Sequence, residues 1–191
     1  MPDAEKPPTP SALPWFELPD EHGTLVRSDA LLARLAVALA LVGRAADREW
    51  IAAVAAVEGE MREWGVDTVW IAIPGAGEDA ARVARALRRA GAAGRLLLDR
   101  DGALHRRLGA ADGPLPVDAA GNARPALLIV ERGGTVRYRL DGGAPPDPGP
   151  AVTWARYLAV LEPECSTCAP AWPADLMVET AEEEESRADS R

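Results

Sequence analysis

Two cysteines three residues apart are the most reactive side chains in this sequence. Cys165 and Cys168 form a C-x-x-C pair, and the 191-residue chain has no other cysteine. Such a pair can close a small disulfide, exchange electrons with a protein thiol or disulfide partner, or donate two thiolates to zinc. The pair can equally be silent. The residue types alone leave these alternatives open.

A zinc ion needs more ligands than one such pair provides. Structural zinc sites hold four ligands, and the only histidines, His22 and His105, lie far from the cysteines in the sequence. A symmetric homodimer that joins two C-x-x-C pairs would complete a four-cysteine site. We therefore expect zinc only together with dimerisation, and otherwise no cofactor.

The histidines do not indicate a hydrolytic centre. Neither His22 nor His105 lies in a G-x-S-x-G or H-E-x-x-H context. Both fall in predicted turns or a short helix, where a single histidine is expected to be exposed to solvent. The sequence therefore predicts no acid–base pair in these segments.

The apolar residues alternate between patterns of buried strands and of amphipathic helices. An uninterrupted apolar run predicts a strand over 35–42, and largely apolar runs predict further strands over 66–73, 96–98 and 126–131. A stripe with steps of four and three predicts a helix that Asp47 would cap and Gly65 would end. The residues of this stripe are Trp50, Val54, Val57, Met61 and Trp64.

The remaining elements complete an alternating plan. Short extended segments are expected at 15–18 and 24–27, the latter followed by a helical turn, and helices at 78–90 and 151–161. Gly133 and Gly134 predict a hairpin that joins 126–131 to 135–140. This order predicts an α/β fold with a central mixed β-sheet flanked by helices.

The composition divides the chain into four segments. Residues 1–12 form a proline-rich arm that we expect to be disordered, 13–161 the folded domain, and 162–176 an extension with the C-x-x-C pair. Residues 177–191 carry six acidic side chains, two arginines and no aromatic residue, so a disordered tail is expected.

The distribution of charge argues against two classes of partner. The net charge is −9, and the ends 1–23 and 177–191 each contribute −4, which leaves 24–176 at −1. The one dense basic cluster, which is Arg82, Arg85, Arg88 and Arg89, has the spacing of a solvated helix face. We therefore expect no nucleic-acid partner. No apolar run approaches the ~20 residues that cross a bilayer, so no membrane contact and a cytoplasmic location are expected.

Three stretches resemble the alkyl hydroperoxide reductase/thiol-specific antioxidant (AhpC/TSA) branch of the thioredoxin-like superfamily, the peroxiredoxins. They are residues 13–20 with 23–26, residues 97–102 leading to 108–109, and residues 124–130 with 134–138. Together they span 13–161. The resemblance implies a thioredoxin-like fold and, for a complete family member, an antioxidant oxidoreductase that reduces peroxides with a cysteine thiolate.

The resemblance fails at the reactive position itself. The family motif P-x-x-x-T-x-x-C corresponds to 43–50, where Gly43, Asp47 and Trp50 stand in place of Pro, Thr and Cys. No shift of the alignment restores the motif, because no cysteine precedes Cys165. Tryptophan cannot form a sulfenic acid. We therefore expect Trp50 to be a core residue and the peroxide-reducing site to be degenerate.

Other family positions are retained. Arg124 matches an arginine that peroxiredoxins keep beside the reactive sulfur, and Pro125 matches a position that is often a cis-proline, although the sequence does not decide the isomer. The run Cys168-Ala-Pro-Ala-Trp172 resembles the arm that carries a resolving cysteine in two-cysteine peroxiredoxins. Without a peroxide-reducing partner, that cysteine would have nothing to resolve.

Three functions are consistent with this sequence. The first is a peroxiredoxin-like (redoxin) domain that has lost its peroxidatic activity and acts as a binding or structural module. The second is a thiol-disulfide oxidoreductase that uses Cys165 and Cys168. The third is a zinc-bridged homodimer through the same pair.

Overall fold

The two central strands consist almost wholly of buried apolar residues. In the computed structural model, β4 (Ala36–Val42) and β5 (Val66–Ala72) pair in parallel, and all seven residues of β4 are buried. This burial is what an uninterrupted apolar run predicts for a strand covered on both faces. The structure describes residues 11–33, 36–42, 48–74, 79–111, 125–141 and 147–168.

Four more strands extend this pair into one mixed sheet. Its order is β1-β8-β7-β4-β5-β6. β6 (Arg95–Leu98) continues the parallel side, whereas β7 (Ala126–Val130) and β8 (Thr135–Asp141) form an antiparallel hairpin beside β4. The predicted hairpin and the predicted mixed sheet are both confirmed.

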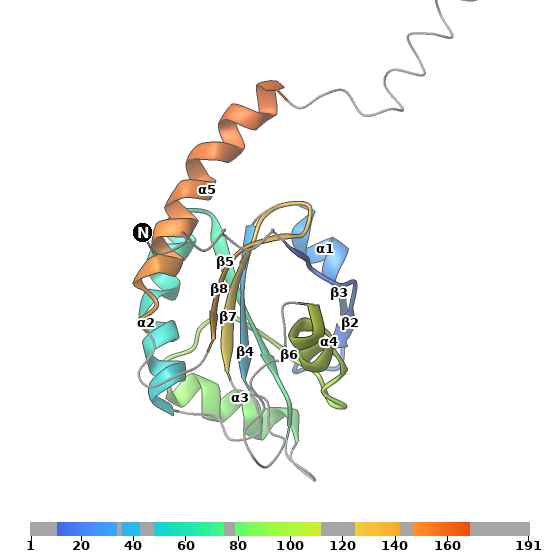
Figure 1. Cartoon of the computed structure of the whole chain (residues 1–191). Coiled ribbons are helices and arrows are strands. Elements are labelled where there is room, and N and C mark those ends of the chain that lie inside the picture. Colours follow the sequence, from blue (N-terminus) through green and yellow to red (C-terminus); the bar gives the residue numbers. More distant parts are fainter. Residues whose placement is uncertain are drawn as a thin grey trace, which may run out of the picture. The chain divides into compact units, whose positions relative to one another are not determined.

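Helices cover the sheet on both faces (Figure 1). One face packs against α2 (Arg48–Glu63), α3 (Ala80–Arg89) and the first part of α5 (Gly149–Cys168). The other packs against α1 (Ser28–Leu32), α4 (Ala103–Ala111) and a small hairpin of β2 (Glu17–Pro19) and β3 (Leu25–Arg27). Alternate residues of each central strand supply the two apolar cores.

The face of α2 that is buried differs from the predicted stripe. Its buried residues are Trp50, Ile51, Val54, Glu58 and Met61, with Val57 only partly buried and Trp64 39% exposed. Trp64 lies at the end of the helix, and the guanidinium of Arg156 lies 5.5 Å from its ring centroid. The predicted end of the helix is confirmed, because Gly65 follows with φ +78°, which glycine adopts readily.

Three elements depart from the predicted plan. Ser11 and Ala12, which the sequence placed in the disordered arm, form β1 and pair with Val136 and Thr135 of β8. The helix α4 was not expected in the order of elements. The last helix continues beyond residue 161 to Cys168, so the C-x-x-C pair lies within the backbone of α5 and not in an extension after it.

The chain divides into two compact units, Met1–Ala159 and Val160–Arg191. The sheet and both cores belong to the first unit. Of the second unit, the structure describes residues 160–168, the end of α5. No helix in the described part of the chain is both long and apolar enough to cross a membrane.

Candidate functional site

The carboxyl ends of the parallel strands meet at one edge of the sheet, where α/β proteins commonly bind ligands. Val42 of β4 pairs with Ala72 of β5, and Ala72 pairs with Leu98 of β6. β7 begins at the same edge, because Ala126 pairs with Leu41. The position of Trp50, in the first turn of the helix after β4, and the partly buried Pro125, directly before β7, belong to this edge.

The structure describes only part of the predicted site. Gly43, Asp47 and Arg124 lie outside the described residues, as does the peptide bond between Arg124 and Pro125. Cys165 and Cys168 belong to the second unit, where the structure places their backbone in the last turn of α5. Of the predicted residues in the first unit, Trp50 and Pro125 are thus the two that the structure places.

Trp50 is a core residue, as predicted. Its side chain is 1% exposed and packs edge-on against Trp70 of β5, with ring centroids 6.3 Å apart and ring planes at 88°. Edge-to-face contacts of this kind are favourable because the positive ring edge meets the negative ring face. Position 50, where the sequence resemblance places the reactive cysteine, therefore holds a buried indole.

A buried aspartate–histidine pair follows β6 at the same edge. Asp99 and His105 are 0% and 1% exposed, and Asp99 Oδ2 lies 2.7 Å from His105 Nδ1. The same oxygen accepts the backbone N–H of His105 at 2.9 Å, within the first turn of α4. The expectation that His105 is solvated is wrong, because the carboxylate six residues earlier binds it. His22, in contrast, is exposed as expected.

This pair stabilises α4 and offers no accessible reactive atom. Burial by itself would raise the pKa of Asp99, but the hydrogen bonds from the His105 side chain and backbone outweigh it and lower the pKa. An ionised Asp99 accepts a hydrogen bond from Nδ1–H of His105 and thereby orients the imidazole ring. Asp99 Oδ1 and His105 Nε2 have no hydrogen-bond partner among the described residues, and both atoms are shielded from solvent.

The lowered pKa of Asp99 predicts a loss of stability in acid. Its contribution is present above the unfolded-state pKa, near 3.8, and is lost as the pH falls through the lower folded-state pKa. We expect Asp99→Asn to lower the free energy of unfolding by about 1–2 kcal/mol at neutral pH. The difference from wild type should shrink below about pH 4. Urea denaturation across pH tests this, and a difference that is constant at every pH would contradict it.

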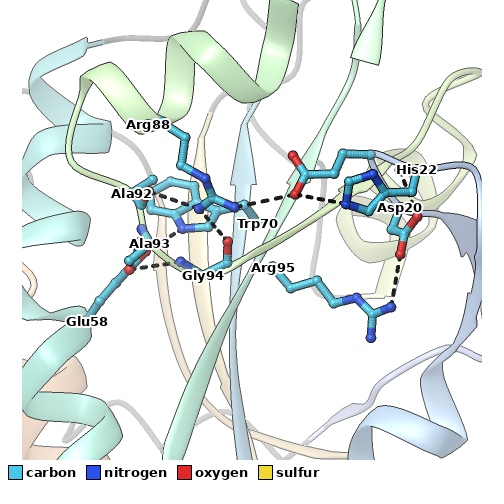
Figure 2. Close-up of polar contacts among 10 residues, drawn as sticks. Asp20, His22, Glu58, Trp70, Arg88, Ala92, Ala93, Gly94 and Arg95 are labelled. Carbon is cyan, nitrogen blue, oxygen red and sulfur yellow. Dashed lines mark hydrogen bonds and ion pairs between the residues drawn. The ribbon is translucent and has the colours of Figure 1, made fainter. Parts of the chain in front are cut away.

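A second buried carboxylate organises the loop between α3 and β6 (Figure 2). Glu58 of α2 is 3% exposed and accepts a hydrogen bond from the indole Nε1 of Trp70. Its other oxygen accepts the backbone N–H groups of Ala93 and Gly94 at 2.8 and 3.0 Å. Sequence reasoning missed Glu58, although its position four residues after Val54 on the apolar face of α2 was a signal.

The loop passes so close to β5 that it requires glycine at one position. A Cβ on Gly94 would lie 2.3 Å from the backbone oxygen of Thr68, well inside contact distance. Arg88 holds the same loop from the other side, because its Nη1 donates to the carbonyls of Ala92 and Gly94 at 3.0 and 2.8 Å (Figure 2). The loop is therefore fixed by groups from α2, α3 and β5.

Charged pairs attach the β2–β3 hairpin to this region. Asp20 accepts a hydrogen bond from Arg95 Nη2 at 3.0 Å and from the backbone of His22 and Thr24 at 2.9 Å each. The Arg95 contact, with help from these backbone donors, lowers the pKa of Asp20. Glu21 lies 3.6 Å from Arg88 Nη2. These contacts position the hairpin and contribute no reactive group.

A metal site is not assembled in the described part of the chain. Within it, no group of three or more His, Cys, Asp or Glu side chains is arranged to hold a metal ion. Asp99 and His105 would supply two ligands only. The expected zinc site through Cys165 and Cys168 depends on a second copy of the chain and stays a prediction.

Comparison with known proteins identifies the fold. No protein-family model and no curated protein sequence matches the chain. Among solved structures, the peroxidoxin BcpB from Mycobacterium tuberculosis is 18% identical, with a TM-score of 0.61 over 78% of this chain and 97% of BcpB. AhpC from Mycobacterium bovis is 13% identical, with a TM-score of 0.58 over 78% of this chain and 95% of AhpC.

A related branch of proteins matches equally well. BsSco, a member of the Sco family of cytochrome c oxidase assembly proteins, is 9% identical, with a TM-score of 0.64 over 82% of this chain and 98% of BsSco. Identities this low establish the arrangement of the backbone and not the chemistry. The chain has the thioredoxin-like fold.

Proposed function

We propose that this chain is a peroxiredoxin-like domain that does not reduce peroxides at the start of α2 and acts as a binding or structural module. The observation that carries the proposal is Trp50, which is 1% exposed and packed against Trp70. A peroxide-reducing site needs an accessible thiolate that can become a sulfenic acid. An indole in the core meets neither requirement.

The other described groups at the carboxyl edge support the same proposal. The ionisable pair there, Asp99 and His105, is buried, and its hydrogen bonds serve the first turn of α4. General acid–base catalysis requires a group within hydrogen-bond reach of a substrate proton. We also infer a cytoplasmic site of action, as expected from the sequence.

The second candidate function is thiol–disulfide exchange at Cys165 and Cys168. The fold favours this candidate, since the solved BsSco structure is described as containing a disulfide switch. The place of the pair in α5 weighs against it. A helix C-terminus carries partial negative charge, which disfavours a thiolate, whereas the reactive cysteine of a thioredoxin-like C-x-x-C motif lies at a helix N-terminus.

A peroxidase assay on the whole protein separates these candidates. We expect the wild type and the Cys165→Ser/Cys168→Ser variant to consume peroxide equally slowly, at the uncatalysed rate. A Ser166→Ala/Thr167→Ala variant controls for changes in the same turn of α5. Turnover that disappears with the cysteines would establish the thiol oxidoreductase and overturn our proposal. Turnover that survives their removal would refute both candidates.

Mass and thiol accessibility test the zinc-bridged homodimer. If zinc holds the pair, alkylation of the cysteines should become fast only after a chelator is added, and the dimer should dissociate at the same time. If the pair is redox-active, mild oxidation should lower the intact mass by about 2 Da, as two hydrogens leave. If the protein is a monomer whose thiols are free under every condition, both the zinc site and the redox function are excluded, and the binding or structural module is supported.

A further inference from the structure

A shallow groove lies between the first half of α2 and the second half of α3. It has a volume of about 530 Å³, and its lining residues are Arg48, Ile51, Ala52, Ala86, Arg89 and Ala90. A smaller hollow of about 370 Å³ shares Arg89 and is otherwise lined by Ala84, Arg85 and Arg88. We call the two together the arginine groove. Its lining combines small or aliphatic side chains with four arginines.

Of the four arginines that line the arginine groove, Arg88 alone forms an ion pair within the described residues, with Glu21 at 3.6 Å. Within the described residues, Arg48, Arg85 and Arg89 are exposed and take part in no ion pair. Elsewhere in the described part of the chain, several arginines pair with acidic neighbours, as Arg95 does with Asp20 and Arg137 does with Glu131, whereas Arg100 and Arg132 do not. The net charge of the chain is −9, so the positive potential at the groove comes from these arginines and not from the charge of the protein as a whole.

Small side chains line the groove where α2 and α3 pack closely together. A Cβ on Gly91, directly after α3, would lie 3.6 Å from the Cβ of Ala55 on α2, which shows how closely the two helices approach. Ala52, Ala86 and Ala90 then leave room for a chain to lie along the groove. An extended peptide with small apolar side chains fits such a floor better than a bulky ligand does.

We propose that the arginine groove binds an extended, carboxylate-rich segment of a protein partner. Guanidinium groups form forked hydrogen bonds with carboxylates, and they do so at several points along a groove when acidic residues are spaced along the ligand. This inference rests on the proposed function as a binding module and assigns the class of its partner.

The chemistry of the groove favours an acidic peptide over a nucleic acid. Proteins that hold single strands without sequence preference combine basic residues with aromatic side chains on which bases stack. The lining residues of the groove include no aromatic side chain. The net charge of −9 would also repel a long polyanion such as a nucleic acid. A short acidic segment would interact mainly with the nearby arginines, which attract it.

The test is binding of a fluorescently labelled synthetic peptide of alternating glutamate and alanine to the full chain, followed by anisotropy. We expect Arg85→Glu/Arg89→Glu to weaken binding about ten-fold or more, because attraction becomes repulsion, and Arg85→Ala/Arg89→Ala to weaken it less. Raising the salt from about 50 mM to about 300 mM should also weaken it. The glutamine–alanine peptide should not bind.

A matched control has the same change of charge away from the groove. Arg100→Glu/Arg132→Glu replaces two exposed arginines of the first unit that do not line the groove, and it should bind the peptide like wild type. Equal losses in both double variants would overturn the proposal, as would equal binding of the glutamine peptide. Tighter binding of a single-stranded RNA than of the acidic peptide would also overturn it.

One further variant distinguishes a partner from the chain itself. Replacing Glu182, Glu183, Glu184 and Glu185 by glutamine removes the acidic run of the C-terminal segment. If this change strengthens peptide binding about ten-fold, the groove binds the chain's own acidic segment and the partner proposal is wrong.

The binding test is independent of the peroxidase test. Peptide binding does not involve cysteine, so peroxide turnover would overturn the proposed function and leave the binding measurement unaffected.

Discussion

Replacement of Trp50 by alanine should lower the free energy of unfolding by about 3–5 kcal/mol, the range for large-to-small changes of buried aromatic residues. Trp50 is 1% exposed, and its loss removes both the buried apolar area and the edge-on contact with Trp70. The melting temperature of a domain of this size should fall by about 10 °C. Urea and thermal denaturation measure both quantities.

Trp15 offers a matched control for this change. Its side chain is 56% exposed, so Trp15→Ala should alter the free energy of unfolding by less than about 1 kcal/mol. If the two alanine variants were equally stable, Trp50 would not be part of the core. The proposal that the reactive position has become a packing position would then fail.

Replacement of Glu58 by alanine should destabilise the domain by about 3 kcal/mol or more, although it removes a charge from the interior. The carboxylate accepts hydrogen bonds from Trp70 Nε1 and from the backbone N–H groups of Ala93 and Gly94. Removal of the acceptor leaves these three donors without it, and each unsatisfied buried group costs about 1–3 kcal/mol. Water that enters the space left by the side chain would reduce the sum.

Two comparisons make the Glu58 prediction specific. Glu63→Ala, on the same helix but exposed, should change the stability by less than about 0.5 kcal/mol. Hydrogen exchange at Ala93 and Gly94 should accelerate in Glu58→Ala more than exchange at the central strands does. Uniform acceleration across the domain would contradict a local role in the loop between α3 and β6.

The strands were predictable where their burial is complete. β4 and β7 are uninterrupted apolar runs, and β5 is apolar apart from Asp67 and Thr68. Other elements cover these strands on both faces of the sheet, so their composition identifies them. β1 has two residues, too few for any periodicity. Among the described side chains of α4, the buried apolar ones are Leu104 and Leu108, a single i, i+4 pair. Short elements depend on tertiary contacts that a local pattern does not encode.

The end of α5 was set too early because of a proline. Pro163 has no N–H for the helix and disfavours helical backbone before it, so the sequence predicts an end at residue 161. The helix nevertheless continues to Cys168. Leu161, Glu162 and Glu164, which surround Pro163, have high helix propensity and favour this continuation.

The sequence predicted the burial of one residue at the candidate site, Trp50, but not the burial of His105 and Glu58. Trp50 belongs to an apolar stripe whose spacing predicts burial, and the structure confirms this for Trp50, Val54 and Met61 but not for Trp64. The burial of His105 depends on Asp99, and that of Glu58 on a tryptophan of β5 and on two backbone groups more than thirty residues away. Polar residues become core residues only when distant partners satisfy them, and one sequence does not show those partners.

The margins of the β-sheet bear on how copies of this protein would associate. β6 is only four residues long, and Asp20 bridges to Leu97 on its outer side. At the opposite margin, β1 covers the start of β8, and beyond it Arg137 and Arg139 engage Glu131 and Asp141. Short margins with charged side chains discourage another strand from adding. Fibre-like growth by strand addition is thereby opposed.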